Sequence, residues 1–244
     1  MGTVGDDFAP YAKRLESLGL DQTYVKHVPK TFTAQAFITT DLDDNQIIAF
    51  HPGAMNEAHI QAVPEEATLG IVAPDGRDAM IQHARQFAEA NVPFLFDPGQ
   101  GLPMFDGNDL KEFIALANFV AVNDYEQAVM SERTGLTPEQ IAAEVEALIV
   151  TRGGEGSEIY VGGERLNIPA AKADEVVDPT GCGDAYRGGI LYGLQKGLDW
   201  SVTGRIASLM GAINIAHHGP QNYRIDLADF AARFESNFGI SFPS

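Results

Sequence analysis

The segment VVDPTGCGDAYRGGILYGL, residues 176–194, is the most informative part of the chain. Two apolar residues lead into a turn with two glycines and two aspartates. A helix is predicted to follow at once, because Tyr186, Ile190 and Leu194 recur at the spacing of one helical face. A glycine-rich turn that opens a helix offers free N–H groups and a positive dipole end to an anion. Asp184 adds a proton acceptor beside that anion, and phosphoryl transfer requires both features.

The order D-P-T-G-C-G-D, followed by an apolar helix of small residues, resembles the signature of the PfkB/ribokinase family of sugar and nucleoside kinases. The resemblance implies that Asp184 is the catalytic base and that the amides of Gly181, Cys182 and Gly183 form the anion hole. Cys182 departs from the pattern, since the family usually has alanine, glycine or serine there, yet cysteine is small enough for the turn. An ordinary strand–turn–helix junction with glycines at positive φ is the alternative interpretation.

Composition limits the classes of protein to consider. The 244 residues fit one large α/β domain, predicted as residues 1–244, and 45% hydrophobic residues provide for a core. A net charge of −18 argues against nucleic acid or an anionic membrane as partner. One cysteine excludes an intrachain disulfide and suits a reducing cytoplasm. Residues 1–8 lack a signal region and no apolar run reaches membrane-spanning length, so a soluble, cytoplasmic protein is expected.

The first third of the chain predicts a helix and then a β-hairpin. A helical stripe runs from residue 8 to residue 18, and two strand-like runs follow at residues 33–40 and 46–50. The connection is rich in acidic residues and superficially resembles a calcium loop, but the glycine and glutamate of an EF-hand do not follow, so a solvated turn is favoured. The residues concerned are Asp41, Asp43, Asp44 and Asn45.

After the hairpin, short apolar runs alternate with amphipathic helices. Strands are predicted at residues 69–73, 93–97, 119–122 and 148–151, and helices at residues 76–90, 110–117 and 125–133. This pattern predicts an α/β fold with a parallel sheet covered on both faces. The resemblance implies a ribokinase-like three-layer α/β/α domain with a mostly parallel sheet and a small β-hairpin lid at residues 31–52.

Polar residues follow three of the predicted strands. Asp97, Asn123 and Thr151 each end a strand, and ligands of open parallel sheets bind outside the carboxyl ends of the strands. We therefore expect these residues to meet at one sheet edge with the turn that contains Asp184.

Two of these segments also match the family. NDYE, residues 123–126, resembles its N-x-x-E motif, which implies that Asn123 and Glu126 organise Mg²⁺ and phosphates, Glu126 largely through water. The alternative is a helix-capping box between the same two residues. TRGGEGS, residues 151–157, resembles the T-x-G-x-x-G segment of the nucleotide site, where Thr151, Gly153 and Gly156 would approach ATP. A plain hairpin turn is the alternative.

Near the C-terminus, residues 208–222 predict a helix closed by Gly219 and Pro220. His217 and His218 point to different faces, so a helix end is favoured over a metal site. The resemblance places this segment beside the adenine pocket and a monovalent-cation site, which potassium would occupy. The implied ATP neighbours are Asn214 and His218, and the implied cation neighbours are Asp178, Thr180, Gly219 and Gln221.

The hairpin sequence resembles the bacterial adenosine-kinase-like branch of the family. Gln35, Phe37 and Phe50 would then contact a purine nucleoside, or the phenylalanines would fill a seam between lid and domain. A homodimer through the lid or through a bare sheet edge is a further expectation. By the resemblance, residues 1–8 correspond to a segment well inside family members, so an N-terminal part of the family fold, with an aspartate that grips substrate hydroxyls, is expected to be missing.

The sequence thus leads to an enzyme that phosphorylates a primary hydroxyl of a nucleoside, with adenosine favoured, or of a sugar, using ATP and Mg²⁺. One alternative is a fructokinase- or ribokinase-type sugar kinase. Another is a protein that binds nucleotide but is inactive because of the missing segment. A dehydrogenase is disfavoured because GCGDAYRG lacks the spacing of a dinucleotide fingerprint.

Overall fold

The computed structural model of the chain describes residues 1–40 and 46–243. The predicted turn with Asp41, Asp43, Asp44 and Asn45 lies outside the described residues. The chain divides into two compact units, the first formed by Met1–Pro93 with Gly99–Phe105 and the second by Phe94–Pro98 with Asp106–Ser244. The assignment of residues 1–244 to one domain stays a prediction.

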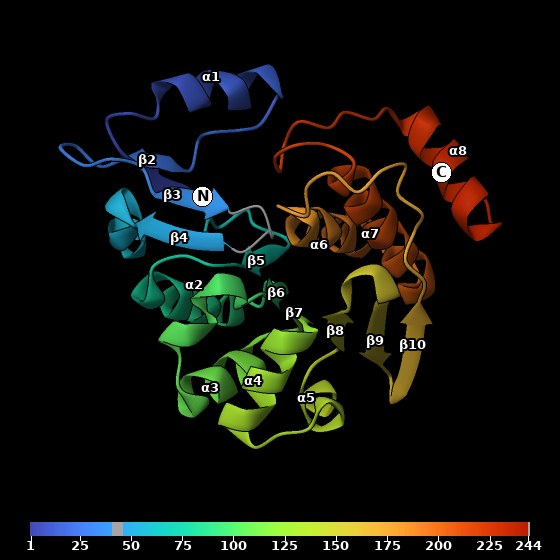
Figure 1. The fold of residues 1–244 in the computed structure, drawn as a ribbon. Helices are drawn as coiled ribbons and strands as arrows, with labels where there is room; N and C mark the ends of the chain where they lie inside the picture. The colour runs from blue at the N-terminus through green and yellow to red at the C-terminus, as the bar shows by residue number, and fades with distance from the viewer. Residues whose placement is uncertain (41–45, 244) are drawn as a thin grey trace. The chain divides into compact units, whose positions relative to one another are not determined.

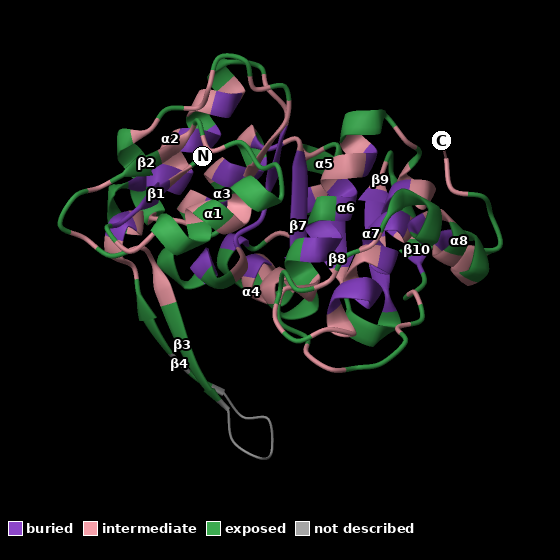
Figure 2. Ribbon diagram, turned by 90° about the horizontal axis from the view of Figure 1, so that it is seen from above, coloured by how far each residue is buried: buried purple, intermediate pink, exposed green. Residues whose placement is uncertain are grey.

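The first unit contains short strands and few helices. Its strands are β1 (Gly2–Val4), β2 (Val25–His27), β3 (Gln35–Thr40), β4 (Gln46–His51) and β5 (Gly70–Val72), and its helices are α1 (Ala9–Ser17), α2 (Arg77–Glu89) and the 3₁₀ helices η1 (Gly53–Ile60) and η2 (Gly99–Met104). Strands β1 and β2 pair in parallel. Strands β3 and β4 pair antiparallel, which confirms the predicted hairpin. Figure 2 shows residues 36–39 of β3 and residues 49–51 of β4 as exposed, whereas Gln35 is partly buried.

The second unit contains the larger sheet. Its strands are β6 (Phe94–Phe96), β7 (Phe119–Asn123), β8 (Ala147–Thr151), β9 (Ser157–Val161) and β10 (Glu164–Ile168), and its helices are α3 (Gly107–Leu116), α4 (Asp124–Thr134), α5 (Pro138–Glu144), α6 (Cys182–Lys196), α7 (Trp200–Ile215), α8 (Leu227–Phe238) and the 3₁₀ helix η3 (Gly153–Glu155). Within this unit the strand order is β10-β9-β8-β7-β6. Strands β6, β7 and β8 are parallel, whereas β9 and β10 join antiparallel because short turns reverse the chain there.

Helices cover both faces of this sheet, as the alternating pattern predicts. Figure 1 shows α3, α4 and α5 on one face and α6 and α7 on the other. The apolar residues of β7 and β8 are buried, which explains why their sequences are continuous apolar runs. Phe96 on β6 stacks on Phe113 of α3 with ring centroids 4.2 Å apart. The α/β fold and its three layers are therefore confirmed.

Helix α6 packs very closely against α7, and glycines make this possible. A Cβ atom on Gly189 would lie 2.4 Å from Cα of Ala207, and one on Gly193 would lie 2.3 Å from Oγ1 of Thr203. Side chains at those positions would force the helices apart. The glycines of the segment at residues 176–194 therefore allow close helix packing, which fixes the position of α6 against α7.

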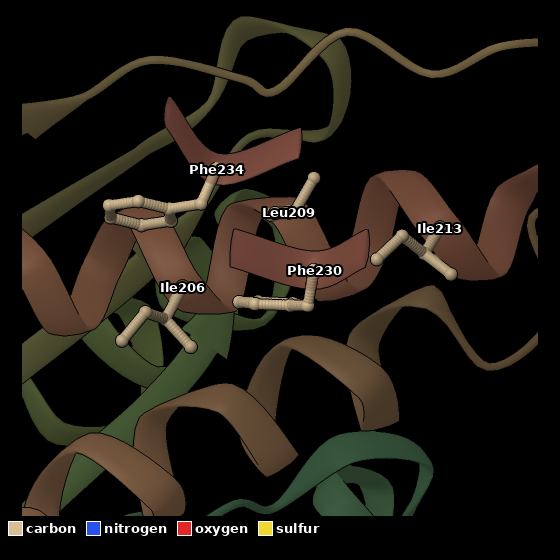
Figure 3. Packing of buried hydrophobic residues seen from close by; sticks show 5 residues of the cluster. All are labelled: Ile206, Leu209, Ile213, Phe230 and Phe234. Atoms are coloured by element: carbon tan, nitrogen blue, oxygen red, sulfur yellow. The ribbon is translucent and has the colours of Figure 1, made fainter. Parts of the chain in front are cut away.

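Helix α8 covers the outer side of α7. Phe230 and Phe234 of α8 pack on an apolar stripe of α7 (Figure 3), formed by Ile206, Leu209 and Ile213. Burying one such phenylalanine stabilises the fold by about 1.5–3 kcal/mol. Within residues 1–40 and 46–243, no helix combines the length and apolar character needed to cross a membrane.

Candidate functional site

The turn before α6 is built around Gly181. This residue caps the helix with φ +81°, and a Cβ atom there would lie 2.4 Å from Cβ of Pro220. Both the left-handed backbone and the contact with Pro220 require glycine. Asp184 lies in the first helical turn with an exposed side chain. The turn therefore presents a helix N-terminus and a carboxylate together, as the sequence predicts.

The three predicted anion-hole amides are not equivalent. The Cys182 amide donates to the Pro179 carbonyl at 3.2 Å, so a bond within the turn already engages it. Gly183 is exposed. Gly181 and Gly183 are therefore the better candidates for anion donors. Burial raises the pKa of the Cys182 thiol, which opposes the lowering that a helix N-terminus would cause.

Asp178 organises the entry to this turn from its N-terminal side. Its two carboxylate oxygens accept from the amides of Thr180, at 2.9 Å, and Gly219, at 2.8 Å. The hydrogen bond from the Thr180 side chain, followed by these amides, lowers the pKa of Asp178 to about 2. Three of the four predicted cation neighbours are thus brought together, whereas Gln221 lies exposed in the following segment.

Asn214 supports the same turn from behind. Its side chain is fully buried on α7, and Nδ2 donates to the Thr180 carbonyl at 2.8 Å and lies 3.4 Å from Sγ of Cys182. Its Oδ1 atom has no hydrogen-bond partner within the described part of the chain. This placement makes Asn214 a support of the turn, and its predicted contact with ATP stays a prediction.

Helix α7 ends earlier than the sequence predicts. The expected stop is Gly219, but the helix ends at Ile215, whose carbonyl accepts from the amides of Val177 at 2.9 Å and Asp178 at 3.1 Å. The incoming chain thus caps the last helical carbonyl. His217 contacts the Ile213 carbonyl through Nδ1 at 2.9 Å, and His218 is exposed beyond the helix. Within the described residues no group of three His, Cys, Asp or Glu side chains could hold a metal ion.

Asn123 and Glu126 form the capping box that is the alternative interpretation of NDYE. The Glu126 amide donates to Asn123 Oδ1 at 2.7 Å, and the Asn123 amide donates to Glu126 Oε2 at 2.8 Å. Burial raises the pKa of Glu126, while the Asn123 amide and Arg187 oppose that rise. The box fixes the orientation of the carboxylate, so it is compatible with a role in organising a cation.

The ends of the three parallel strands meet as expected. Thr151 at the end of β8 lies opposite Asn123 at the end of β7, and its hydroxyl donates to the Val122 carbonyl at 3.4 Å. Asp97 follows β6 and forms an ion pair with Arg187 of α6 at 3.0 Å. The prediction that these strand ends share one edge with the Asp184 turn is confirmed by the fold.

The glycine segment after β8 is a hairpin connection between the antiparallel strands β8 and β9. Gly153 has φ +53° and is exposed, whereas Gly156 has φ +90° and is buried. A Cβ atom on Gly156 would lie 2.1 Å from the Ile168 carbonyl oxygen. The alternative interpretation as a hairpin turn is therefore correct as geometry, and contact with ATP stays a prediction.

The three predicted lid residues lie on the hairpin of the first unit. Gln35 donates through Nε2 to Asp7 Oδ2 at 2.7 Å, so its amide is already engaged. Phe37 lies opposite Ala49 and Phe50 opposite Ala36, which places the two phenylalanines on opposite faces. Both are more than half exposed, at 59% and 53%. A ligand on one face of the hairpin would therefore meet only one of them.

Two side chains of α6 make buried contacts that the sequence does not predict. The Tyr186 hydroxyl lies 2.6 Å from Oγ of Ser157, both buried, and the Arg187 guanidinium pairs with Asp97. Burial raises the pKa of Tyr186 to about 12. The signal in the sequence is an arginine within an otherwise apolar helical stretch, directly after the Asp184 turn. Its partners lie far away in the chain.

Comparison with known proteins agrees with this geometry. A family model described as pfkB family carbohydrate kinase matches residues 1–226. The structure of Burkholderia thailandensis nucleoside kinase in complex with inosine is 52% identical, with a TM-score of 0.96, and the match covers 99% of this chain and 80% of that chain. A structure of the same enzyme in complex with ADP-inosine has a TM-score of 0.95 at 52% identity, with coverage of 99% and 76%. The nucleoside kinase of Methanocaldococcus jannaschii is 32% identical over 223 residues, which is 91% of this chain and 74% of that protein.

Proposed function

Because the chain belongs to the pfkB family of carbohydrate kinases and is a kinase, we propose that it transfers the γ-phosphoryl group of ATP to a primary hydroxyl group of a purine nucleoside. The observation that carries this proposal is the exposed Asp184 beside the Gly181 turn at the N-terminus of α6. The resemblance to enzymes named nucleoside kinases, one of them in complex with inosine, supports a nucleoside over a sugar.

In the proposed reaction Asp184 accepts the proton of the substrate hydroxyl while that oxygen attacks the γ-phosphorus atom. The bond between this phosphorus and the β,γ-bridging oxygen breaks, and ADP leaves with the electron pair. The amides of Gly181 and Gly183, together with the N-terminus of α6, would stabilise the charge on the phosphoryl oxygens. The resemblance of residues 178–184 to the family signature and the exposure of Asp184 support these roles.

The residues near the strand ends fit a Mg²⁺ ion that would be bound mainly by the phosphates of ATP. The described residues there do not form a metal site made of protein side chains alone. Glu126 offers a carboxylate oriented by Asn123, and water would connect it to Mg²⁺. When bound, Mg²⁺ would neutralise charge on the β- and γ-phosphates. Potassium at Asp178, Thr180 and Gly219 belongs to the same proposal, and a comparison of rates in potassium and in choline salts tests it.

The hairpin is proposed to contact the nucleoside and to exclude water from it, which would suppress ATP hydrolysis. Its support is the exposure of Phe37 and Phe50, because an isolated two-stranded ribbon with apolar side chains on both faces is only marginally stable in water. A second copy of the chain could also cover these side chains. Sedimentation with and without nucleoside distinguishes the two arrangements.

The test is ADP release from Mg-ATP in potassium buffer, with adenosine, inosine, ribose and fructose offered in parallel. We expect ADP release that depends on a purine nucleoside. Preferred release with ribose or fructose would instead establish a sugar kinase. A protein stabilised by Mg-ATP that releases no ADP with any acceptor would be the inactive nucleotide-binding protein that the sequence leaves open.

A further inference from the structure

Helix α6 carries a buried arginine three residues after Asp184, and two carboxylates share it. Arg187 donates through Nε to Asp97 Oδ2 at 3.0 Å and through Nη2 to Asp97 Oδ1 at 3.4 Å. The same Nη2 atom lies 3.8 Å from Oε2 of Glu126 and 3.5 Å from the carbonyl of Ala121. The side chains of Arg187, Asp97 and Glu126 are 7%, 9% and 13% exposed. One guanidinium therefore connects α6, the end of β6 and the start of α4.

A buried ion pair of this kind is a poor device for stability alone. Removing two charges from water costs several kcal/mol per ion, and well-packed apolar residues of the same volume often give an equally stable protein. Arginine adds planar, two-point geometry, which a lysine cannot reproduce. The pairing with Asp97 uses that geometry and fixes the plane of the guanidinium. The position of the third nitrogen atom, Nη1, is thereby determined as well.

The two terminal nitrogen atoms, Nη1 and Nη2, lie near two different parts of the candidate site. A Cβ atom on Gly183 would lie 3.3 Å from Nη1 of Arg187, so Nη1 lies close to Gly183 in the first turn of the same helix. On the other side, Nη2 and the Asn123 amide both approach Oε2 of Glu126. Among the described residues nothing donates a hydrogen bond to Oε1 of Glu126. The carboxylate is therefore held by one oxygen and offers the other.

We propose that Arg187 is a positioning residue that holds the Glu126 carboxylate and the first turn of α6, around Gly183, in one fixed arrangement. Oε1 of Glu126 would then be available to the water molecules around a Mg²⁺ ion bound to the nucleotide phosphates. The proposal rests on the proposed function. Arg187 itself touches neither substrate nor nucleotide, and it acts through the two groups that it holds. Asp97 belongs to the same device, because it fixes the guanidinium.

The test compares Arg187→Met and Arg187→Lys with the wild type. Calorimetry measures the affinity for ADP with and without Mg²⁺, and steady-state kinetics measure kcat and the KM for inosine. In Arg187→Met we expect the gain in ADP affinity that Mg²⁺ provides, and kcat, to fall about 10- to 100-fold, as for residues that orient the ligands of a metal. The KM for inosine should stay within about twofold, and Arg187→Lys should recover part of the loss.

Thr134→Ala is the matched control for stability. Thr134 is buried at the opposite end of α4 from Glu126, and its hydroxyl donates to the Met130 carbonyl at 2.7 Å. Its loss should lower the melting temperature and leave the Mg²⁺-dependent affinity for ADP unchanged. Asp97→Asn keeps Arg187 but weakens the ion pair that fixes its guanidinium, so it should lower kcat and the effect of Mg²⁺ in the same direction as Arg187→Met. It serves as the alternative test if Arg187→Met does not fold.

The inference is overturned if Arg187→Lys and Asp97→Asn both keep the wild-type kcat and the wild-type effect of Mg²⁺ on ADP affinity, or if Mg²⁺ does not change the affinity of the wild type for ADP. A wild type that phosphorylates no nucleoside contradicts the proposed function instead. In that case the calorimetric comparison still shows whether Arg187 positions Glu126.

Discussion

The turn at the start of α6 and the β3–β4 hairpin both carry predicted site residues, and they are built in opposite ways. The turn rests on polar groups whose hydrogen bonds are made within the protein, namely the partly buried Asp178 with Thr180 and Gly219, and the buried Arg187 with Asp97. The hairpin has two strands and exposes Phe37 and Phe50 on opposite faces. A site that stabilises charge benefits from groups fixed beforehand, whereas a segment that covers a ligand must be able to move.

The largest effect is expected from Asp184→Asn, which removes the proposed base and leaves the turn intact. Turnover with inosine should fall by about 10²–10⁴-fold, the usual contribution of a positioned base. Because Asp184 is exposed, the melting temperature and the affinity for ADP should stay near those of the wild type. The measurement is kcat beside a thermal melt, and near-normal turnover would remove Asp184 from its role.

Gly181→Ala tests whether the turn is rigid because of its packing. Alanine at φ +81° is strained, and its Cβ atom would lie 2.4 Å from Pro220 Cβ. The two effects together should cost about 2–5 kcal/mol of unfolding free energy. Gly188→Ala is the matched control on the same helix, since a Cβ atom there meets nothing within 4 Å, and it should stabilise α6 slightly. Equal denaturation midpoints for both variants would contradict the rigid turn.

The sequence predicts the parts of this comparison that are local. The order of strands and helices, the strand ends Asp97, Asn123 and Thr151, and the glycine turn all follow from short patterns of residues. The hairpin is predicted for the same reason, because alternation and turn residues are adjacent in the chain. The sequence does not predict strands β9 and β10, since these segments alternate weakly and include charged residues.

The partnerships between distant residues could not be predicted. Arg187 and Asp97 are 90 positions apart, and Tyr186 and Ser157 are 29 apart, so only the folded sheet brings them together. The end of α7 at Ile215 is unpredictable for the same reason, because the amides that cap it come from residues 177 and 178. Likewise, the support of the turn by Asn214 depends on the close packing of α6 on α7.

The hairpin half of the comparison is tested with Phe37→Ala and Phe50→Ala. Neither should change stability by more than about 1 kcal/mol, since both side chains are more than half exposed. Only the face that meets the nucleoside should matter, so one variant should raise the KM for inosine about 5- to 30-fold, equivalent to about 1–2 kcal/mol. The other phenylalanine is its control. Unchanged KM values in both variants would exclude the hairpin from the substrate site.

A smaller effect is expected inside the rigid half, at the bond between Tyr186 and Ser157. Tyr186→Phe leaves Ser157 Oγ without its partner in a buried place, which should cost about 1–3 kcal/mol. The double variant Tyr186→Phe with Ser157→Ala removes both polar groups. Its loss of unfolding free energy should be smaller than the sum of the losses of the two single variants. Chemical denaturation of the four proteins measures this coupling, and strictly additive losses would mean that the two hydroxyl groups do not interact.

The smallest effect concerns Asp178, and its dependence on pH appears only in acid. Its folded pKa is about 2, below the ordinary value of 3.8, because Thr180 and the Gly219 amide bond the ionised form. A lowered folded pKa contributes stability that is complete above the unfolded pKa and is lost as the pH falls through the folded value. The difference in melting temperature between wild type and Asp178→Asn should therefore be constant from pH 7 to pH 5 and shrink from pH 4 downward. A constant difference to pH 3 would show that the Asp178 carboxylate is not held by the turn, and the rigidity of that region would then rest on Asn214 and the glycine packing alone.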